Sequence, residues 1–414
     1  MVSIPTWHIS TFESLMLVLL ASFLVPIIIS RFKRLDMPIV VGEIIAGMIL
    51  GPSLLGIIDG HGEVLLFCRE FGLGYLMFIA GMELDFSMIG KISKSAGEVK
   101  SKMISHPLFI SSITFFLTLL LSVIISKGLE QRGLIDNSWM FALILSTTSL
   151  GVVLPVLKEK GLSDSLFGQT VLMSALFADF FTMLLISLLA TYLEGGLNIE
   201  MMLVFFLFLA FSVLYRTGIV AQRSTRINKL FEDLSHATAQ IKLRASLAIF
   251  VGFIVLAEFL NAEMILGAFI AGVVISLLTT SPDRKVEKDL EAFGFSFFIP
   301  IFFVLVGVGF DIQELTASNE ALLLVPVLLL AALIVKFVPS LLFRISFTWT
   351  ETIAAGSLLS ARLSLIIAAS LIALDLGIVT PAVNSAIILV AIITVTISPI
   401  VFSKLMPNGK SEEE

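Results

Sequence analysis

The chain has 414 residues, of which 57% are hydrophobic and only 14% are charged. Its mean hydropathy of +1.06 is too high for a water-soluble domain of this length. The composition therefore indicates an all-α polytopic membrane protein, and no nucleic-acid partner is expected. The net charge of −6 is a sum over the whole chain and identifies no partner.

Apolar stretches of about 20 residues recur along almost the whole chain, and each is long enough to cross a hydrocarbon core of roughly 30 Å as a helix. The sequence predicts about thirteen transmembrane helices in one domain at 1–405, followed by a polar tail at 406–414. The expected spans are 12–31, 36–54, 63–84, 104–126, 138–157, 164–192, 199–216, 240–259, 261–279, 289–310, 319–343, 350–373 and 380–404.

Lys and Arg are distributed unevenly between the expected loops. With the N-terminus outside, the inner loops hold most of the 26 Lys and Arg residues, while the outer loops keep Lys127 and Arg132. Because inner loops are enriched in basic residues, this predicts an N-terminus outside and a C-terminus inside. We expect a multi-pass protein of the inner or plasma membrane of a prokaryotic cell.

Two of the expected spans are poor continuous helices. The fifth contains a Ser-Thr-Thr-Ser run at 146–149 that is followed by a glycine and a proline, and the twelfth has a glycine and three serines around Arg362. Proline removes a backbone donor, and hydroxyl groups can bind carbonyls that a break leaves free. Both spans are therefore candidates for interrupted helices, although small residues also serve close helix packing.

The two interruptions correspond if the chain contains two repeats. Repeat one would cover about 12–192 and repeat two about 240–404, joined by a linker helix at about 199–216. The fifth span then runs inward and the twelfth outward, so the repeats are inverted. Inverted repeats with two crossed interrupted helices are typical of secondary transporters, whose ion site lies near the membrane midplane.

Asp179 is the one ionisable residue in the stretch LMSALFADFFTML of the sixth span. A carboxylate at that depth costs at least roughly 2.5–3.5 kcal/mol, so we expect a role in function or in a buried pair. Removal from water favours the protonated form of a carboxyl group. One carboxyl that holds either a proton or a monovalent cation can exchange the two. The alternative is a structural pair with Lys336 or Arg362.

Lys336 and Arg362 are further charges within expected spans. Lys336 is expected to neutralise Asp179 when no ion is bound, unless it extends to the inner interface. Arg362 is expected to balance the half-helix dipoles at the second break. Glu43 lies in the second span, where a role in the access pathway and a role in packing are equally open.

Oxygen ligands for a monovalent cation at Asp179 are expected from Thr147 or Thr148, from Ser174 and from backbone carbonyls of the break. The four histidines are scattered along the chain, which suggests no metal cluster. No Gly-x-x-x-x-Gly-Lys loop for ATP occurs, which argues against a primary pump. No cofactor is expected beyond the transported K⁺ or Na⁺ and H⁺.

Five segments, taken in order, carry a resemblance to a known family, namely 36–56, 70–85, 266–276, 297–311 and 357–370. They resemble the monovalent cation:proton antiporters, in the branch that holds the Kef-type potassium/proton and Nap-type sodium/proton exchangers. The resemblance implies thirteen helices, a dimer-forming domain and a mobile core with two crossed, interrupted helices. It also implies that Asp179 is the ion-binding aspartate, Lys336 the buried lysine and Arg362 the arginine at the second break.

The chain departs from this family pattern in two places. Ala178 stands where the family usually has Asp, Asn or Gln, and Leu363 and Ser364 follow the arginine where Gly-Glu is common. Ala178 removes a ligand or an ion-pair partner, so the stoichiometry of the family does not transfer directly. Kef-type relatives often carry a nucleotide-binding domain after the last span, so regulation is expected in a separate cytosolic subunit, in a removed domain, or nowhere.

The sequence therefore predicts a secondary transporter rather than an enzyme. It is expected to be a homodimer in membrane lipid that exchanges K⁺ or Na⁺ for H⁺ by alternating access, with electroneutral 1:1 stoichiometry. Two alternatives stay open. A gated cation channel or uniporter on the same scaffold needs a continuous path with several weak sites, and a membrane sensor subunit predicts no flux at all.

Overall fold

The computed structural model describes residues 11–31, 38–58, 60, 62–82, 107–163, 165–196, 209, 212–213, 241–260, 262–278, 284–317 and 319–406. Every regular element in these ranges is helical. The predicted linker helix at 199–216, apart from three residues, and the polar tail after residue 406 lie outside the described residues.

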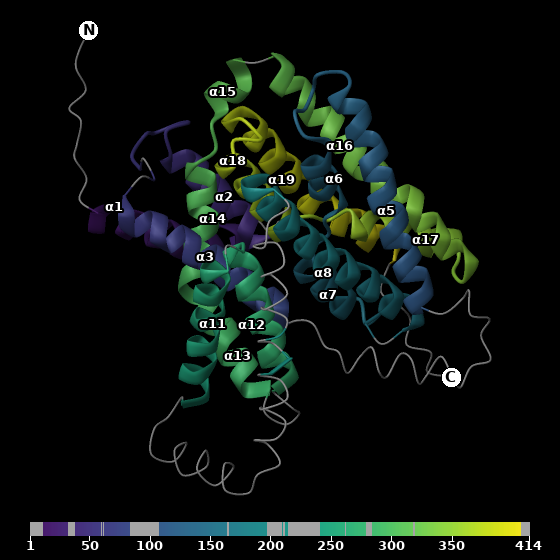
Figure 1. Cartoon of the computed structure of the whole chain (residues 1–414), viewed down its shortest axis with the longest axis horizontal. Coiled ribbons are helices and arrows are strands. Elements are labelled where there is room, and N and C mark those ends of the chain that lie inside the picture. Colours follow the sequence, from purple (N-terminus) through teal and green to yellow (C-terminus); the bar gives the residue numbers. More distant parts are fainter. Residues whose placement is uncertain are drawn as a thin grey trace, which may run out of the picture.

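The helices follow one another as Figure 1 shows. The first half of the chain forms α1 (Thr11–Arg31), α2 (Ile39–Leu50), α3 (Glu63–Met82), α5 (Pro107–Glu130), α6 (Ser138–Ser146), α7 (Leu150–Glu159) and α8 (Leu166–Gly195). The second half forms α11 (Ile241–Phe259), α12 (Met264–Leu278), α13 (Arg284–Phe293), the π-helix η2 (Gly294–Phe298), α14 (Ile299–Val308), α15 (Ile312–Ala317), α16 (Asn319–Ser340), the 3₁₀-helix η3 (Leu341–Ile345), α17 (Trp349–Leu359), α18 (Ser364–Asp375) and α19 (Pro381–Leu405).

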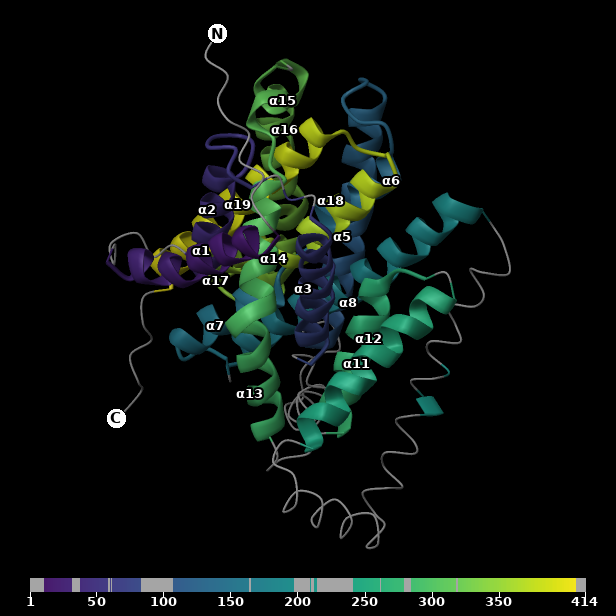
Figure 2. The same cartoon turned by 90° about the vertical axis from the view of Figure 1, so that its left-hand side faces the viewer.

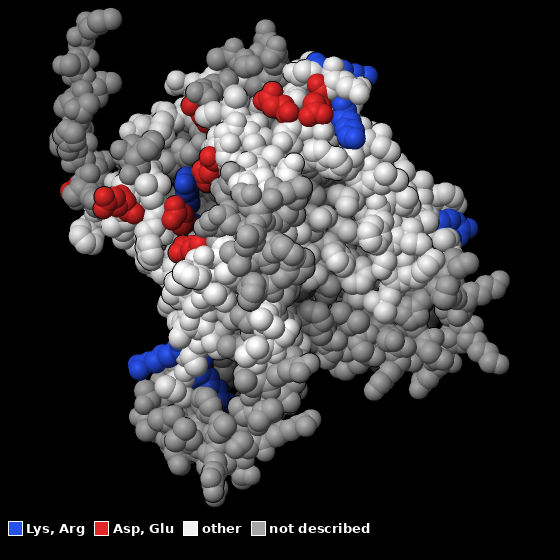
Figure 3. Space-filling model, in the orientation of Figure 1, with Lys and Arg blue, Asp and Glu red and all other residues white. Residues whose placement is uncertain are grey.

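Length and apolar composition suit many of these helices to a lipid bilayer. Among the described residues, nine helical segments are long and apolar enough to cross a membrane, and two apolar helices, α2 and α12, are shorter. On the face drawn in Figure 3, charged side chains gather toward the margins and leave a broad uncharged area. The predicted fold class of an all-helical membrane protein is confirmed, while the helix count of thirteen and the topology stay predictions.

Helices from the two halves of the chain pack against each other. In Figure 1, α5, α8, α16 and α17 lie to the right, while α1, α3 and α11–α14 lie to the left and below. Figure 2 shows the same molecule after a rotation of 90° about the vertical axis. The contacts pair α2 with α14, α3 with α12, α5 with α16 and α6 with α18. Neither half is therefore a separate bundle, and each contributes helices to both groups.

Glycines allow two of these pairs to meet backbone to backbone. A Cβ added at Gly47 of α2 or at Gly307 of α14 would lie 1.9 or 2.0 Å from a carbonyl oxygen of the opposite helix. The same holds for Gly81 of α3 and Gly272 of α12, where the distances would be 2.2 and 2.0 Å. Small residues at such crossings maximise van der Waals contact between membrane helices.

The two predicted helix interruptions are confirmed. The first separates α6 from α7 at residues 147–149, and the second separates α17 from α18 at residues 360–363. Pro155 lies inside α7, beyond the first break. The hydroxyl-rich run itself is therefore non-helical, and the proline that helped to predict the break does not form part of it.

Candidate ion-binding site

Arg362 lies in the second break and binds the carbonyl end of α6. Its Nε donates to the carbonyl oxygen of Thr147 at 3.1 Å, and its Nη2 donates to those of Leu145 at 2.8 Å and Ala332 at 2.9 Å. The side chain is 0% exposed. Because carbonyls at a helix C-terminus lack intrahelical partners and carry partial negative charge, a buried cation is favoured here. Arg362 therefore joins the two breaks.

Lys336 of α16 binds the same end of α6 from another side. Its Nζ donates to the carbonyl oxygen of Ser146 at 2.8 Å and to Thr148 Oγ1 at 2.6 Å. The side chain is only 4% exposed. The alternative that Lys336 extends to the membrane interface is therefore wrong, because its ammonium group is directed into the break. Two cations thus stabilise the C-terminal end of this half-helix.

Asp179 of α8 occupies the opposite end of the first break. Its Oδ2 accepts a hydrogen bond of 2.8 Å from the backbone N–H of Leu150, the first residue of α7. A carboxylate is favoured at this position because the free N–H groups of a helix N-terminus carry partial positive charge. Among the described contacts, neither Lys336 nor Arg362 donates a hydrogen bond to Asp179. The carboxylate is held by the half-helix instead.

Two polar atoms of this region are buried without a hydrogen-bond partner among the described residues, namely Asp179 Oδ1 and Arg362 Nη1. A buried acceptor without a donor is costly, so a group that carries such an atom commonly binds a further species. A proton on Oδ1 or a cation beside it would each satisfy this oxygen. The carboxylate, hydroxyl and carbonyl oxygens at the break form a donor set that suits a monovalent cation.

The structure places two of the three predicted hydroxyl ligands at the break. Thr147 and Thr148 are both fully buried there, and Thr148 Oγ1 also donates to the carbonyl oxygen of Leu359 at 3.3 Å. Ser174 lies elsewhere on α8, where its Oγ is 3.1 Å from Ser111 Oγ of α5. The hydroxyl group of Ser174 is thus directed toward α5 in this structure, and its predicted role as a ligand stays a prediction.

Sequence reasoning missed a pair of hydroxyl groups where the end of α6 meets α8. Ser146 Oγ and Thr182 Oγ1 are 3.2 Å apart, and both side chains are fully buried. Thr182 follows Asp179 by three residues, so the two share one face of α8. This three-residue spacing is visible in the sequence and could have identified Thr182. The backbone groups of Leu150 and Ala332 had no signal in the sequence, since their partners lie far away along the chain.

The arrangement of these groups can bind one monovalent cation inside an otherwise apolar protein. One carboxylate faces the positive end of a half-helix, and two cations face the negative end of another. These groups meet where the two interrupted helices touch. Such a junction in a bundle of membrane-spanning helices defines an ion-translocating membrane protein.

Comparison with known proteins gives the family. A family model described as "Sodium/hydrogen exchanger, transmembrane" matches residues 19–406. The chain is 38% identical over 401 residues to YjbQ of Bacillus subtilis (strain 168), which covers 97% of this chain but 64% of YjbQ. It is 26% identical to the Na(+)/H(+)-K(+) antiporter GerN of Bacillus cereus, over 88% of this chain and 89% of GerN. The chain thus spans slightly less than two thirds of YjbQ.

The fold is similar to that of the sodium proton antiporter MjNhaP1 from Methanocaldococcus jannaschii at pH 8, with a TM-score of 0.63 and 17% sequence identity. The match covers 96% of this chain and 98% of MjNhaP1. Our chain belongs to the sodium/hydrogen exchanger family. The predictions of a cation/proton antiporter, of a multi-pass membrane protein and of a protein other than an enzyme are confirmed at this level.

Proposed function

We propose that this chain exchanges Na⁺ or K⁺ for H⁺ with Asp179 as the shared binding residue. The observation that carries the proposal is the split role of the carboxylate: Oδ2 is fixed at the start of α7, and Oδ1 is buried without a partner. An ionised buried carboxylate needs a compensating charge. Either a cation or a proton supplies it, and the two exclude each other at one oxygen.

The break provides the remaining ligands in this proposal. Thr147 and Thr148 contribute oxygens from its middle, and the carbonyl groups at the end of α6 retain a second lone pair beside their bonds to Lys336 and Arg362. Unwound carbonyls and half-helix ends coordinate cations in other transporters. K⁺ stays a candidate beside Na⁺ because the relative GerN is a Na(+)/H(+)-K(+) antiporter by name.

The packing of the two halves supports inverted repeats. If repeat one begins at α1 and repeat two at α11, then α2 corresponds to α12 and α3 to α13–α14. A two-fold axis that exchanges the repeats converts the contact between α2 and α14 into the contact between α12 and α3, and both contacts are present. Thirteen helices, an outer N-terminus, an inner C-terminus, a homodimer and a separate cytosolic regulatory subunit belong to the same proposal.

Reconstituted protein tests this function directly. Liposomes that contain a pH dye receive Na⁺, K⁺ and Li⁺ in turn, and an antiporter should move protons in response to at least one cation. A channel or uniporter would instead pass the cation without coupled proton movement, and a sensor subunit would give no flux. Either of these results would overturn the proposal.

Lys336→Met should change the cation concentration needed for half-maximal exchange and its dependence on pH. The lysine places one positive charge at the end of α6, where it competes with the cation for the oxygens of the break. We therefore expect tighter apparent cation binding, by several-fold, measured as cation-driven proton flux between pH 6 and 9. Lys404→Met, at the last turn of α19, is the matched control. Identical profiles for both variants would contradict the role of Lys336.

Exchange should be electroneutral because Ala178 leaves Asp179 as the one carboxylate of the site. Each half-cycle then carries one proton or one monovalent cation, and the site has the same charge in both loaded states. The pair of Na⁺ and H⁺ gradients at which net flux is zero, the balance point, should not change when a potassium-diffusion potential is imposed. K⁺/H⁺ exchange is measured in the same way in a choline background. If Lys336 also released a proton, about 2.3 kcal/mol per 100 mV would enter the balance. A shift of the balance point with voltage would refute the 1:1 mechanism.

A further inference from the structure

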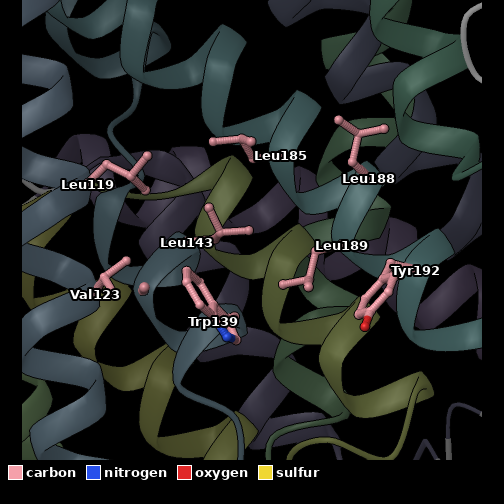
Figure 4. A pocket seen from close by; sticks show the side chains of 9 residues that line it. Leu119, Val123, Trp139, Leu143, Leu185, Leu188, Leu189 and Tyr192 are labelled. Atoms are coloured by element: carbon pink, nitrogen blue, oxygen red, sulfur yellow. The ribbon is translucent and has the colours of Figure 1, made fainter. Parts of the chain in front are cut away.

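An apolar cavity of about 330 Å³ lies between α5, α6 and α8. In Figure 4, leucine side chains from the three helices surround it, together with Val123, Trp139 and Tyr192. Its volume is within the range of small-molecule binding sites, roughly 300–1,000 Å³. The ion site does not use this cavity, although α6 and α8, which line it, carry the break and Asp179.

The surroundings of the cavity are those of a surface in contact with lipid. On α5, Phe116, Leu120 and Ile124 are 64%, 57% and 58% exposed. Trp139 is 55% exposed and Tyr192 is 44% exposed, and in Figure 4 the indole nitrogen and the phenol oxygen both lie in the lower half of the view. Trp139 lies in the first turn of α6 and Tyr192 in the last turn of α8. Exposed Trp and Tyr near helix ends are typical of the boundary between hydrocarbon and head groups.

A cation stands beside this aromatic boundary. Lys127, in the last turn of α5, has its Nζ 5.1 Å from the ring centroid of Trp139. The nearby carboxylate of Glu130 accepts a 3.0 Å hydrogen bond from the backbone N–H of Ser138 at the start of α6, although it also attracts Lys127 at longer range. No described residue forms a hydrogen-bonded ion pair with Lys127, so its ammonium group is available to an anion.

We propose that this cavity binds an acyl chain of a membrane phospholipid whose phosphate is held by Lys127. The apolar walls match a hydrocarbon chain, the aromatic side chains match the level of the glycerol region, and the ammonium group matches the phosphate in charge. A second protein copy would have to insert an apolar side chain between Trp139 and Tyr192 and, with the same contact, present an anion to Lys127. The lipid would bridge α5 to α6 and α8.

Fluorescence of Trp139 tests the proposal, because bromine on an acyl chain quenches an indole that it contacts. The chain has 3 Trp residues, so Trp7→Phe and Trp349→Phe leave Trp139 as the sole reporter. The protein is reconstituted with increasing mole fractions of brominated phosphatidylglycerol or brominated diacylglycerol, which lacks a phosphate. We expect saturable quenching, half-maximal at a several-fold lower mole fraction of the phospholipid.

Two variants separate the parts of the site. Lys127→Met should remove the difference between the two lipids, and Val123→Phe, which fills the cavity, should remove the saturable component. Val255→Phe on α11, where Val255 is 56% exposed, is the matched control and should behave as the parent protein. Quenching that rises linearly with both lipids and is unchanged by Val123→Phe would show bulk lipid only and overturn the proposal. Absence of quenching by either lipid would show that protein covers the cavity, which also overturns it.

Discussion

Asp179→Asn should abolish cation-driven proton flux in liposomes, with a loss of at least about a hundred-fold, while the protein stays folded. A carboxamide neither titrates nor neutralises a bound cation. Its oxygen can still accept the hydrogen bond from the Leu150 N–H that Oδ2 accepts now, so the start of α7 should keep its cap and the free energy of unfolding should change by only about 1 kcal/mol.

The matched control is Asp289→Asn, which makes the same chemical change on α13, away from the breaks. It should transport like the parent protein. Thermal unfolding in detergent is measured for both variants, so that loss of transport is separated from loss of fold. Full flux in a folded Asp179→Asn protein would remove Asp179 from the mechanism, while the family membership of the chain would stand on its own.

Arg362→Ala should be the most destabilising single substitution in this region. It leaves the carbonyl groups of Thr147, Leu145 and Ala332 without the guanidinium group that now binds them. Ala332 lies inside α16, where its carbonyl keeps an intrahelical hydrogen bond. An unsatisfied buried acceptor costs about 1–3 kcal/mol, so the sum over the two carbonyls at the end of α6 is roughly 2–6 kcal/mol. We expect a large fall in the thermal unfolding midpoint in detergent and loss of transport.

Arg344→Ala provides the comparison on η3. Arg344 is exposed; its Nη1 donates to the carbonyl oxygen of Phe347 at 3.0 Å, and its guanidinium carbon lies 5.5 Å from the centroid of the Trp349 ring. Loss of this one hydrogen bond should cost about 0.5–1.5 kcal/mol. Arg362→Lys keeps the charge but not the spread of donors, so its midpoint should fall between the two alanine variants. Equal thermal unfolding midpoints for Arg362→Ala and Arg344→Ala would show that Arg362 has no special role in stabilising the break.

The sequence predicted the helical spans well where apolar runs are long, and less well at their ends. The span expected at 104–126 continues to Glu130 in α5, so Lys127 belongs to the helix and not to a loop. The span expected at 36–54 ends at Leu50, because Pro52 follows and the residue before a proline disfavours helical backbone. Hydropathy measures the affinity of a segment for lipid, whereas local backbone chemistry sets its ends.

The candidate site was predictable in its charges but not in its contacts. A charge within an apolar span is visible in the sequence, and so are hydroxyl-rich runs that weaken a helix. The partners of Arg362 are backbone carbonyls from α6 and α16, which carry no residue-specific signal. Ser174 lies five residues before Asp179, about 140° around the helix, and its role as a ligand stays a prediction. These contacts depend on how the helices pack against one another, which the structure shows and the sequence does not.

The crossings at Gly47 with Gly307 and at Gly81 with Gly272 have a consequence for how this protein responds to its solvent. Their main chains touch directly, so the attraction between these helices comes from close contact of protein atoms and does not require water to be displaced. Exchange of bilayer for detergent changes the surrounding hydrocarbon but leaves such contacts intact. The four helices α2, α3, α12 and α14 should therefore hold together as a unit in detergents that strip lipid from the outer faces of the other helices.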